Sequence, residues 1–426
     1  MANFKALKGQ GHGPTLFAAF LYFDFSFMVW TMLGPLVTEI SESLAMHGEM
    51  LTEGQKATLL SVPILAGALL RIVLGFSVDK IGAKKTALIA QTIVMSVLFY
   101  AYLRGETISY NELLMVALGL GFAGASFAVA LPQAGQWYPP KLQGIVLGIA
   151  GAGNVGVVID FLFAPKIAEK WGWEAVFLVG GVLSVMVFVA YMFIAKDAPA
   201  SVYKPRPKKL VDYWKLLKDR DSWWFMLFYA VSFGGFVGLA NYMKVYLMNT
   251  YQADMTAFGL EVFNEPNVKV IAGYFGALTI FSGAVLRPVG GSMADKMGGI
   301  KALYIFFGIV LVLAVLNGMM QLPFWIAIGA MFVIMASLGM ASGSVFQLVP
   351  QRFGKDIGIM TGLIGAAGGI GGTFLVKTFG WTKGTFDSYS MGFFIYAGFV
   401  LVAILAISLV KTRWRTTWGV KSGGMI

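Results

Sequence analysis

The sequence contains 426 residues, of which 58% are hydrophobic and 12% are charged. A soluble domain is about a quarter charged residues, so this composition excludes an ordinary soluble enzyme and also a disordered chain. Cysteine is absent, which excludes disulfides, thiol nucleophiles, iron–sulfur clusters and thiolate zinc sites. The net charge of +11 indicates basic cytoplasmic loops on a membrane protein rather than a nucleic-acid partner. The chain is therefore predicted to be an integral protein of a lipid bilayer.

Twelve apolar runs are long enough to cross a bilayer as helices, which takes about 20 residues each. The runs do not alternate as the strands of a β-barrel would, and the first is too long for the apolar region of a signal peptide. The predicted fold class is thus an all-α membrane protein with twelve transmembrane helices. In chain order the runs are 15–37, 53–77, 86–103, 112–135, 144–165, 173–195, 223–247, 270–293, 302–320, 323–349, 357–379 and 388–410.

Lysine and arginine are distributed unequally between the two sides of the predicted helix bundle. The side that holds both termini carries 22 of them, the opposite side carries 8, and Arg71 and Arg287 lie inside helices. Because basic residues accumulate in cytoplasmic loops, both termini are predicted to be cytoplasmic. We expect a multi-pass protein of the cytoplasmic (inner) membrane.

The chain divides into two similar halves. One long polar segment, 196–222, separates an N-terminal half, 1–195, from a C-terminal half, 223–426, and each half holds six of the runs. The segment RIVLGFSVDKIGAKK at 71–85 aligns without gaps with RPVGGSMADKMGGIK at 287–301, an offset of 216 residues. Two six-helix repeats joined by a cytoplasmic linker are typical of a secondary transporter with its substrate site between the halves.

The aligned repeats place one arginine at an equivalent position in each half. Arg71 and Arg287 each precede the aspartate of their repeat, Asp79 or Asp295, by eight residues, which is about 12 Å along a helix and hence near the middle of the bilayer. An arginine at this depth is tolerated where it faces a cavity or a partner. The planar guanidinium suits a flat oxyanion such as nitrate, nitrite or a carboxylate. The alternative is that each arginine is neutralised by a buried carboxylate.

Two glycine-rich runs, GIAGAGNVG and GLIGAAGGIGG, lie in the fifth and eleventh spans. Glycine costs about 1 kcal/mol relative to alanine inside a helix, so this density needs a reason. Close packing of neighbouring helices is one, and a narrow passage with helices that slide past each other during transport is another. Asn154 interrupts the first run and is a candidate donor to an oxyanion. The glycines are Gly148, Gly151, Gly153 and Gly156 in the first run, and Gly362, Gly365, Gly368, Gly369, Gly371 and Gly372 in the second.

The aligned repeats also end in a charged motif that resembles the cytoplasmic loop motif of the major facilitator superfamily. It lies just past the second and eighth predicted spans, and such a motif concerns gating rather than substrate choice. The alternative is ordinary interfacial loop chemistry. Its residues are Gly75, Asp79 and Lys80 in the first half and Gly291, Asp295 and Lys296 in the second.

The chain as a whole resembles the nitrate/nitrite porter family of that superfamily. The resemblance covers essentially all twelve spans and is carried by segments that include YFDFSFMVWTMLGPL at 22–36, PILAGALLR at 63–71, AGAGNVG at 150–156, SGSVFQLVPQRF at 342–353 and the second glycine run. It implies the major facilitator fold, and nitrate or nitrite held by Arg71, Arg287 and Asn154. A long central insertion of eukaryotic relatives is missing, which indicates a prokaryotic protein. The aromatic residues that the resemblance assigns to the site are Phe127, Tyr229, Phe233 and Phe346.

Other functions fit the sequence less well. A membrane enzyme would need a nucleophile–base pair or metal ligands at membrane depth, and the only histidines, His12 and His47, lie near the ends of the first span. We therefore expect no catalytic residue, metal or cofactor, and a monomer. An exchanger of small carboxylates such as oxalate and formate is the closest competitor.

The mode of coupling is open at this stage. Two arginines in one dry cavity repel each other, which favours nitrate/nitrite exchange unless the protein supplies a counter-charge. Asp24 is the candidate, because it lies about 14 Å along the first helix and level with Arg71. Our hypothesis is that Asp24 couples nitrate import to protons, and its alternative is a permanent ion pair or a cap on neighbouring backbone. Asp160 is a weaker candidate nearer the outer face.

The charge distribution makes a direct prediction about topology. A reporter fused after Lys209 or near Gly424 should report a cytoplasmic location, and one inserted near Gly48 should report the outside, because the basic loops stay in the cytoplasm. A cytoplasmic signal at Gly48 would show that the charge distribution does not set the orientation.

Overall fold

The computed structural model describes residues 9–139, 142, 146, 149–151, 153–199, 210–354, 356–421 and 426. Gly148 of the first glycine run lies outside these residues. Every regular element among them is helical. The elements are α1 (Gly13–Thr31), α2 (Leu33–Met46), α3 (Glu53–Ile81), α4 (Ala83–Arg104), η2 (Gly105–Thr107), α5 (Tyr110–Gly124), α6 (Phe127–Gln136), η4 (Gly153–Val155), α8 (Gly156–Trp171), α9 (Trp173–Ile194), α10 (Leu210–Lys218), α11 (Arg220–Phe258), η5 (Gly259–Phe263), α12 (Val268–Met297), α13 (Gly299–Met319), α14 (Phe324–Phe353), α15 (Ile357–Phe386), α16 (Ser390–Thr416) and α17 (Trp418–Lys421).

The prediction of twelve spanning helices is confirmed. Twelve helical segments of the described chain are long and apolar enough to cross a membrane, and each corresponds to one predicted run. Several helices are longer than their apolar runs. The seventh run, 223–247, lies inside α11, which begins at Arg220 and ends at Phe258. Helix geometry persists into the polar boundary because backbone hydrogen bonds, and not apolar side chains alone, hold a helix together.

The charged motif at the end of each aligned repeat is helical, so its predicted position in a loop is wrong. Helix α3 continues to Ile81 and α12 to Met297, and each ends at a glycine with a positive φ, +88° at Gly82 and +91° at Gly298. Left-handed backbone of this kind favours glycine, so the helix ends there and not at the charged residues before it. The motif residues that the helices include are Gly75, Asp79, Lys80, Gly291, Asp295 and Lys296.

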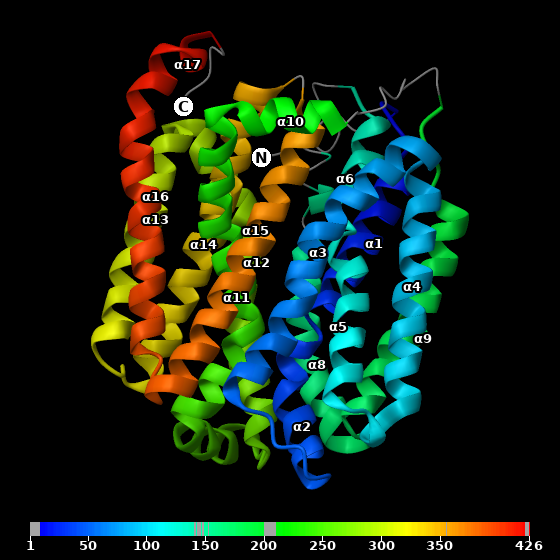
Figure 1. The fold of residues 1–426 in the computed structure, drawn as a ribbon, viewed down its shortest axis with the longest axis vertical. Coiled ribbons are helices and arrows are strands. Elements are labelled where there is room, and N and C mark those ends of the chain that lie inside the picture. The colour runs from blue at the N-terminus through cyan, green and yellow to red at the C-terminus, as the bar shows by residue number, and fades with distance from the viewer. Residues whose placement is uncertain are drawn as a thin grey trace.

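The first six spans and the last six lie side by side. Figure 1 shows the N-terminal helices, blue to green, on the right and the C-terminal helices, green to red, on the left. We call the end at which α1 begins and α16 ends the proximal end, and the opposite end, which holds α2, the distal end. Helices α3 and α15 pack together where the two groups meet, as do α8 and α12, and α2 and α11. The boundaries 1–195, 196–222 and 223–426 stay a prediction.

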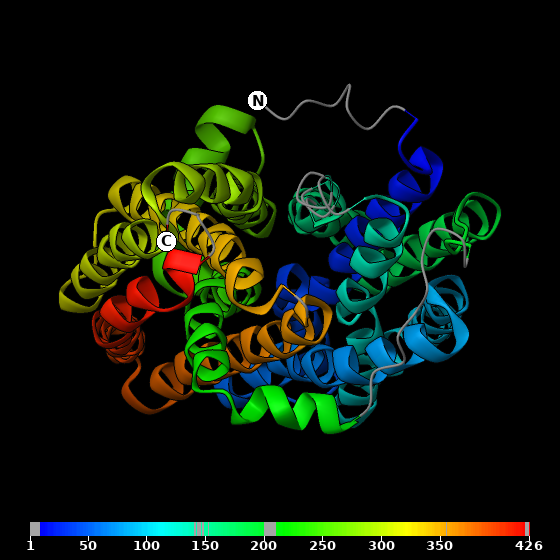
Figure 2. The same ribbon diagram turned by 90° about the horizontal axis from the view of Figure 1, so that it is seen from above.

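The polar segment between the halves contains one helix among its described residues. Helix α10 lies across the ends of the spanning helices in Figure 1, and Figure 2 shows it along one edge of the bundle. The ring of Tyr213 on α10 packs against Phe76 of α3, with centroids 5.0 Å apart. The segment that joins the halves is therefore anchored at the proximal end of α3.

Candidate functional site

Arg71 lies at the centre of the bundle, on α3. Its side chain is buried, and it donates from Nε to the Gly124 carbonyl at 3.2 Å and from Nη1 to the Gly365 carbonyl at 2.6 Å. Gly124 belongs to the N-terminal helices and Gly365 to α15, so one guanidinium bridges both groups. A carbonyl offers only partial negative charge, so these bonds position the guanidinium without neutralising it.

Arg287 lies on α12 and faces the same central region. Its Nη2 donates to the hydroxyl of Tyr229 at 2.7 Å, while its Nη1 is buried and has no hydrogen-bond partner among the described residues. A buried donor without a partner is costly and is common where a ligand completes the site. The unsatisfied Nη1 thus marks a position where a negatively charged acceptor would be stabilised.

Aromatic rings surround both arginines, as the resemblance implies. The ring of Phe233 lies between them, with its centroid 5.6 Å from Cζ of Arg71 and 5.5 Å from Cζ of Arg287. Phe127 lies 5.4 Å from Arg71, and Phe346 lies 5.5 Å from Arg287. The ring of Tyr229 lies 5.8 Å from Cζ of Arg287, so all four assigned aromatic residues are brought together around the two cations.

The Tyr229 and Phe233 rings form one surface of this site. They are one helical turn apart on α11 and stack with centroids 4.9 Å apart and planes inclined by 9°. Phe346 meets Tyr229 edge to face at 5.1 Å. Stacked and edge-to-face arrangements are the favoured geometries of aromatic pairs, so the three rings stabilise one another in this arrangement.

Sequence reasoning missed Trp30. This residue of α1 is buried, its ring lies 5.5 Å from Cζ of Arg71, and its Nε1 donates to the Pro63 carbonyl at 2.7 Å. Its indole lies against Gly67 and Gly124, where an added Cβ atom would overlap it. The signal available in the sequence was a tryptophan in mid-span, where tryptophan is less usual than at the membrane boundary.

Most of the described glycines in the two runs allow close contacts. An added Cβ at Gly368 would lie 2.8 Å from Cδ1 of Tyr229 and 2.9 Å from Cδ1 of Phe233, and one at Gly365 would lie 2.9 Å from Nη1 of Arg71. The second run thus packs directly on the site. Gly153 and Gly156 lie against the backbone of α1, Gly369 lies against α3, and Gly371 and Gly372 lie against α11, whereas Gly151 and Gly362 face open space.

Asn154 and Asp24 lie at the contact between η4 and α1, and neither forms a hydrogen bond to Arg71 or Arg287 among the described residues. Asn154 is buried on η4, a short 3₁₀ turn that contacts α1 and α12, and its Oδ1 has no partner among the described residues. Asp24 is half-buried on α1, and its Oδ1 accepts the Gly156 N–H at 2.8 Å, at the start of α8. The structure therefore shows Asp24 as a cap on the backbone of α8.

The arginines are not neutralised by protein carboxylates in the part of the chain that the structure describes. None of the ion pairs between described residues includes Arg71 or Arg287. Both guanidinium groups lie within about 6 Å of the Phe233 ring, so their like charges repel each other. Two cations near mid-membrane without a carboxylate partner among the described residues create a positive potential at the centre of the bundle.

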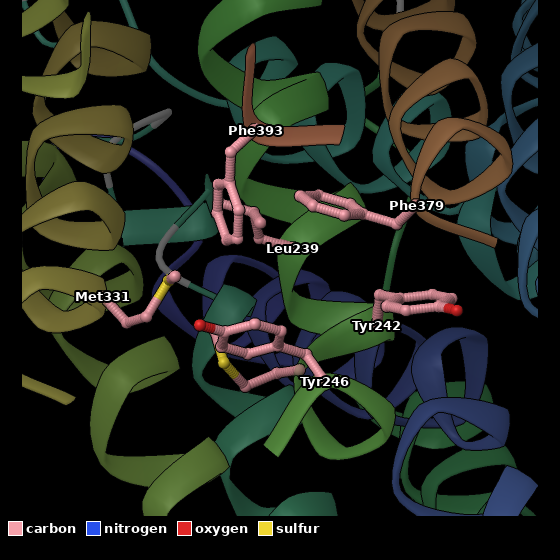
Figure 3. A pocket seen from close by; sticks show the side chains of 7 residues that line it. Leu239, Tyr242, Tyr246, Met331, Phe379 and Phe393 are labelled. Atoms are coloured by element: carbon pink, nitrogen blue, oxygen red, sulfur yellow. The ribbon is translucent and has the colours of Figure 1, made fainter. Parts of the chain in front are cut away.

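A small cavity away from the arginines, shown in Figure 3, has an apolar lining. It lies within the C-terminal helices and carries no charged side chain among its described lining residues. The Tyr242 hydroxyl points away from its centre in Figure 3 and bonds to Glu53 of α3 at 3.3 Å. An apolar lining offers nothing to an anion, so this cavity is not part of the site. Its lining residues are Leu239, Tyr242, Met243, Tyr246, Met331, Phe379 and Phe393.

Comparison with known proteins agrees with this geometry. The family model of the Major Facilitator Superfamily matches residues 16–376. The chain belongs to the major facilitator superfamily. The chain is 30% identical to the probable nitrate transporter NarT of Staphylococcus carnosus, over 91% of this chain and 92% of that protein. It is 29% identical to the probable nitrate/nitrite antiporter NarK1 of Thermus thermophilus, over 91% and 89%. The assignment of this transporter to the nitrate/nitrite porters is therefore confirmed, and it is not an enzyme.

Comparison with solved structures identifies the fold of the chain and nothing further. The transporter superposes on a bacterial homologue of the human lysosomal transporter Spinster, in an inward-facing and occupied conformation, with a TM-score of 0.68 and 15% identity over 93% of this chain and 96% of that one. A point mutant of the nucleoside transporter NupG gives a TM-score of 0.66 and 16% identity over 92% and 99%. The expected major facilitator fold is confirmed.

The glycine contacts predict a difference between two substitutions on α15. We expect Gly368→Ala to destabilise the transporter by about 1–3 kcal/mol, because its methyl group would push apart the stacked Tyr229 and Phe233 rings. Gly362→Ala is the matched control, since an added Cβ there meets no atom within 4 Å. The midpoint of thermal unfolding of the purified protein measures both. Equal midpoints would mean that the rings move aside freely.

Proposed function

We propose that this transporter moves nitrate, nitrite or both across the cytoplasmic membrane by alternating access. The observation that carries the proposal is the pair of arginines, Arg71 and Arg287, which share one aromatic surface near mid-membrane without a carboxylate partner among the described residues. A single small anion between the halves would relieve the repulsion between the two cations. The names of the relatives support nitrate and nitrite as that anion.

The chemistry of the site favours a flat, singly charged anion. Guanidinium groups donate parallel hydrogen bonds in a plane, and the unpartnered Nη1 of Arg287 supplies one such donor. The stacked Tyr229 and Phe233 rings present a flat surface, which suits a planar anion better than a tetrahedral one such as phosphate. Asn154 would act as a further polar contact, brought toward the anion when η4 moves with α8. The relatives, named as nitrate and nitrite transporters, favour nitrate over planar carboxylates such as oxalate and formate.

The two halves would rock about this central site. Glycines on α15 face α3 and α11, and glycines at the start of α8 face α1, so backbones at these contacts lie close together with few side chains to interlock. We propose that these contacts let the helices slide. Because one chain supplies both arginines, a monomer is a complete transport unit. The distribution of basic residues supports an orientation with both termini in the cytoplasm.

Import coupled to protons is our proposal for the driving force, with Asp24 as the proton site. The Asp24 carboxylate caps the N-terminus of α8, where the helix dipole stabilises negative charge. Protonation would weaken this cap, which is worth about 0.5–2 kcal/mol, and would loosen η4 with Asn154 next to it. The proton would thus act through the helix start and not through an arginine ion pair.

Nitrate/nitrite exchange is the second candidate function. It is favoured by the finding that neither Arg71 nor Arg287 forms an ion pair among the described residues. An empty site would then hold two uncompensated cations, which opposes closure of the empty carrier. A carrier of this kind would cross the membrane only when an anion is bound.

The first functional prediction concerns the geometry of the cations. We expect Arg71→Lys and Arg287→Lys each to lower the apparent affinity for nitrate in uptake about ten- to hundredfold. The lysine ammonium keeps the charge but loses the planar set of donors of the guanidinium. A hydrogen bond to a charged group is worth about 1.5–3 kcal/mol, which corresponds to that loss of affinity. Uptake of nitrate and of formate into proteoliposomes gives the measurement and compares the two anion classes.

Arg104→Lys is the matched control for these variants. Arg104 pairs with Glu112 near the membrane boundary and is largely exposed, so its replacement should leave uptake unchanged. Near-normal nitrate uptake by either central lysine variant would show that the arginines are structural or act as diffuse charge. Formate uptake that exceeds nitrate uptake would assign the transporter to carboxylates instead.

The second functional prediction concerns coupling. Asparagine caps helices about as well as aspartate but does not titrate, so Asp24→Asn should keep α8 intact while losing proton-driven accumulation of nitrate. The measurement is nitrate accumulation in liposomes under an inward proton gradient, without internal nitrite, with nitrate/nitrite exchange as the control. Unchanged gradient-driven uptake in the variant would eliminate Asp24 as the proton site. A wild-type protein that needs anion on both sides would be an exchanger.

A further inference from the structure

The distal end of the bundle is closed by polar contacts between the halves. Lys269 of α12 pairs with Glu42 of α2, and Lys377 of α15 donates to Thr58 of α3 at 2.5 Å. Gly380 also lies against Ala57 so closely that an added Cβ would overlap it. The topology proposed above places this end on the outer side, so the structure shows the transporter with its outer side shut.

The contact at the centre of this closure is a buried ion pair. Lys244 of α11 is fully buried and donates to Glu39 Oε1 at 2.5 Å and to the Pro35 carbonyl at 2.6 Å. Both acceptors belong to α2, on the other half. A buried ion pair keeps its stability only while its hydrogen bonds are intact, so the halves cannot part here without exposing both charges to water. We call Lys244, Glu39 and the Pro35 carbonyl the outer latch.

One carboxyl group near the latch has no hydrogen-bond partner among the described residues. Asp160 of α8 is 4% exposed, and its Oδ2 is buried and unpaired. The charge of Lys244 reaches it, but that lysine is bonded to Glu39. A buried, unpaired carboxylate is far more costly than a buried carboxylic acid, so the closed state favours the protonated form of Asp160.

The other charged groups around the latch do not replace a partner for Asp160. They include Glu39 and Glu42 on α2, Lys244 on α11 and Lys269 on α12, where each lysine is paired with one of the glutamates. Glu106 of η2, Glu169 of α8 and Glu174 of α9 line the same distal cavity, and because they are acidic they offer Asp160 no positive partner. The charges of the latch are thus balanced without Asp160. An ionised Asp160 would add an uncompensated negative charge to a dry interface.

The distal surface offers protons a route to this region. A cavity of about 300 Å³ opens between α2, α8, α9 and α12, and both Glu39 and Lys269 line it. When the halves part, water from this cavity reaches the latch, and a solvated aspartic acid is ionised at neutral pH. Closure must then return Asp160 to its neutral form.

We propose that Asp160 is a proton-binding site of the outer gate, and that it takes a proton from the outer solution each time the latch of Lys244 and Glu39 closes. The proposal rests on the alternating-access function above. Asp160 lies one helical turn beyond Gly156, about 6 Å along α8 from the residue that Asp24 caps. Asp160 therefore controls closure of the gate, and Asp24 is a separate carboxyl nearer the substrate.

The experiment measures the gate directly, without substrate. Since the chain has no cysteine, spin labels attach only at introduced ones, and Met50→Cys and Leu260→Cys place two labels at exposed positions of opposite halves at the distal end. Electron–electron distances are recorded in lipid nanodiscs at about pH 5 and about pH 8. We call the labelled protein without further substitutions the parent. In the parent we expect a longer distance between the two labels at the higher pH. With Asp160→Asn, whose side chain stays neutral, we expect a short distance at both pH values.

Two further variants make the result specific. Asp254→Asn removes an exposed carboxylate at the same end and should keep the full pH response of the parent. Asp160→Glu keeps a titrating carboxyl and should also keep the response, which separates loss of titration from loss of folding. A parent without a pH response, or an Asp160→Asn variant that responds as the parent does, would overturn the proposal. Neither outcome bears on which anion is carried, because no anion is present.

Discussion

The structure depends on keeping two arginine side chains ionised near the middle of a bilayer without a described carboxylate paired to either. An arginine at this depth costs about 2.5 kcal/mol or more, and a second one nearby adds repulsion. Backbone carbonyls, a tyrosine hydroxyl and aromatic faces offset part of this cost at Arg71 and Arg287. They leave the net charge in place, and in the function proposed above that charge attracts the anion.

The glycine-rich helices are a consequence of this arrangement. For its carbonyl to reach Arg71, α15 must approach α3 closely, and Gly365 and Gly369 are the residues at that contact. Gly368 lies where the second run would carry asparagine if it repeated the first, and it packs on the Tyr229 and Phe233 rings. A larger residue there would displace the aromatic surface. The two glycine runs therefore differ in their contacts: α15 provides close packing and a carbonyl for Arg71, whereas the run before α8 packs on α1.

Charge is handled in opposite ways at the two levels of the transporter. Near the centre, cations lack carboxylate partners among the described residues, so a mobile anion can compensate them. At the distal end, Lys244 and Lys269 are paired with glutamates of the other half, so no mobile anion is needed and the interface stays shut. Movement of an anion between the levels then requires the distal pairs to separate while the central pair stays in place. This difference explains how one interface can bind a substrate and also seal it from water.

The amino-acid sequence by itself determined the twelve helices, the internal repeat and the paired arginines, because apolar length, the gapless match of 71–85 with 287–301 and rare mid-span charges can be read without a structure. The aromatic residues around the arginines were assigned by the family resemblance. It did not show where the helices end, since Gly82 and Gly298 stop them beyond the apolar runs. It did not show Trp30 as a neighbour of Arg71, and it offered a backbone cap by Asp24 only as an alternative, without naming α8 as the capped helix. These depend on which helices meet and at what register. The partner of a buried charge, such as Glu39 for Lys244, lies about 200 residues away and is decided by the packing of the two halves, which hydropathy does not encode.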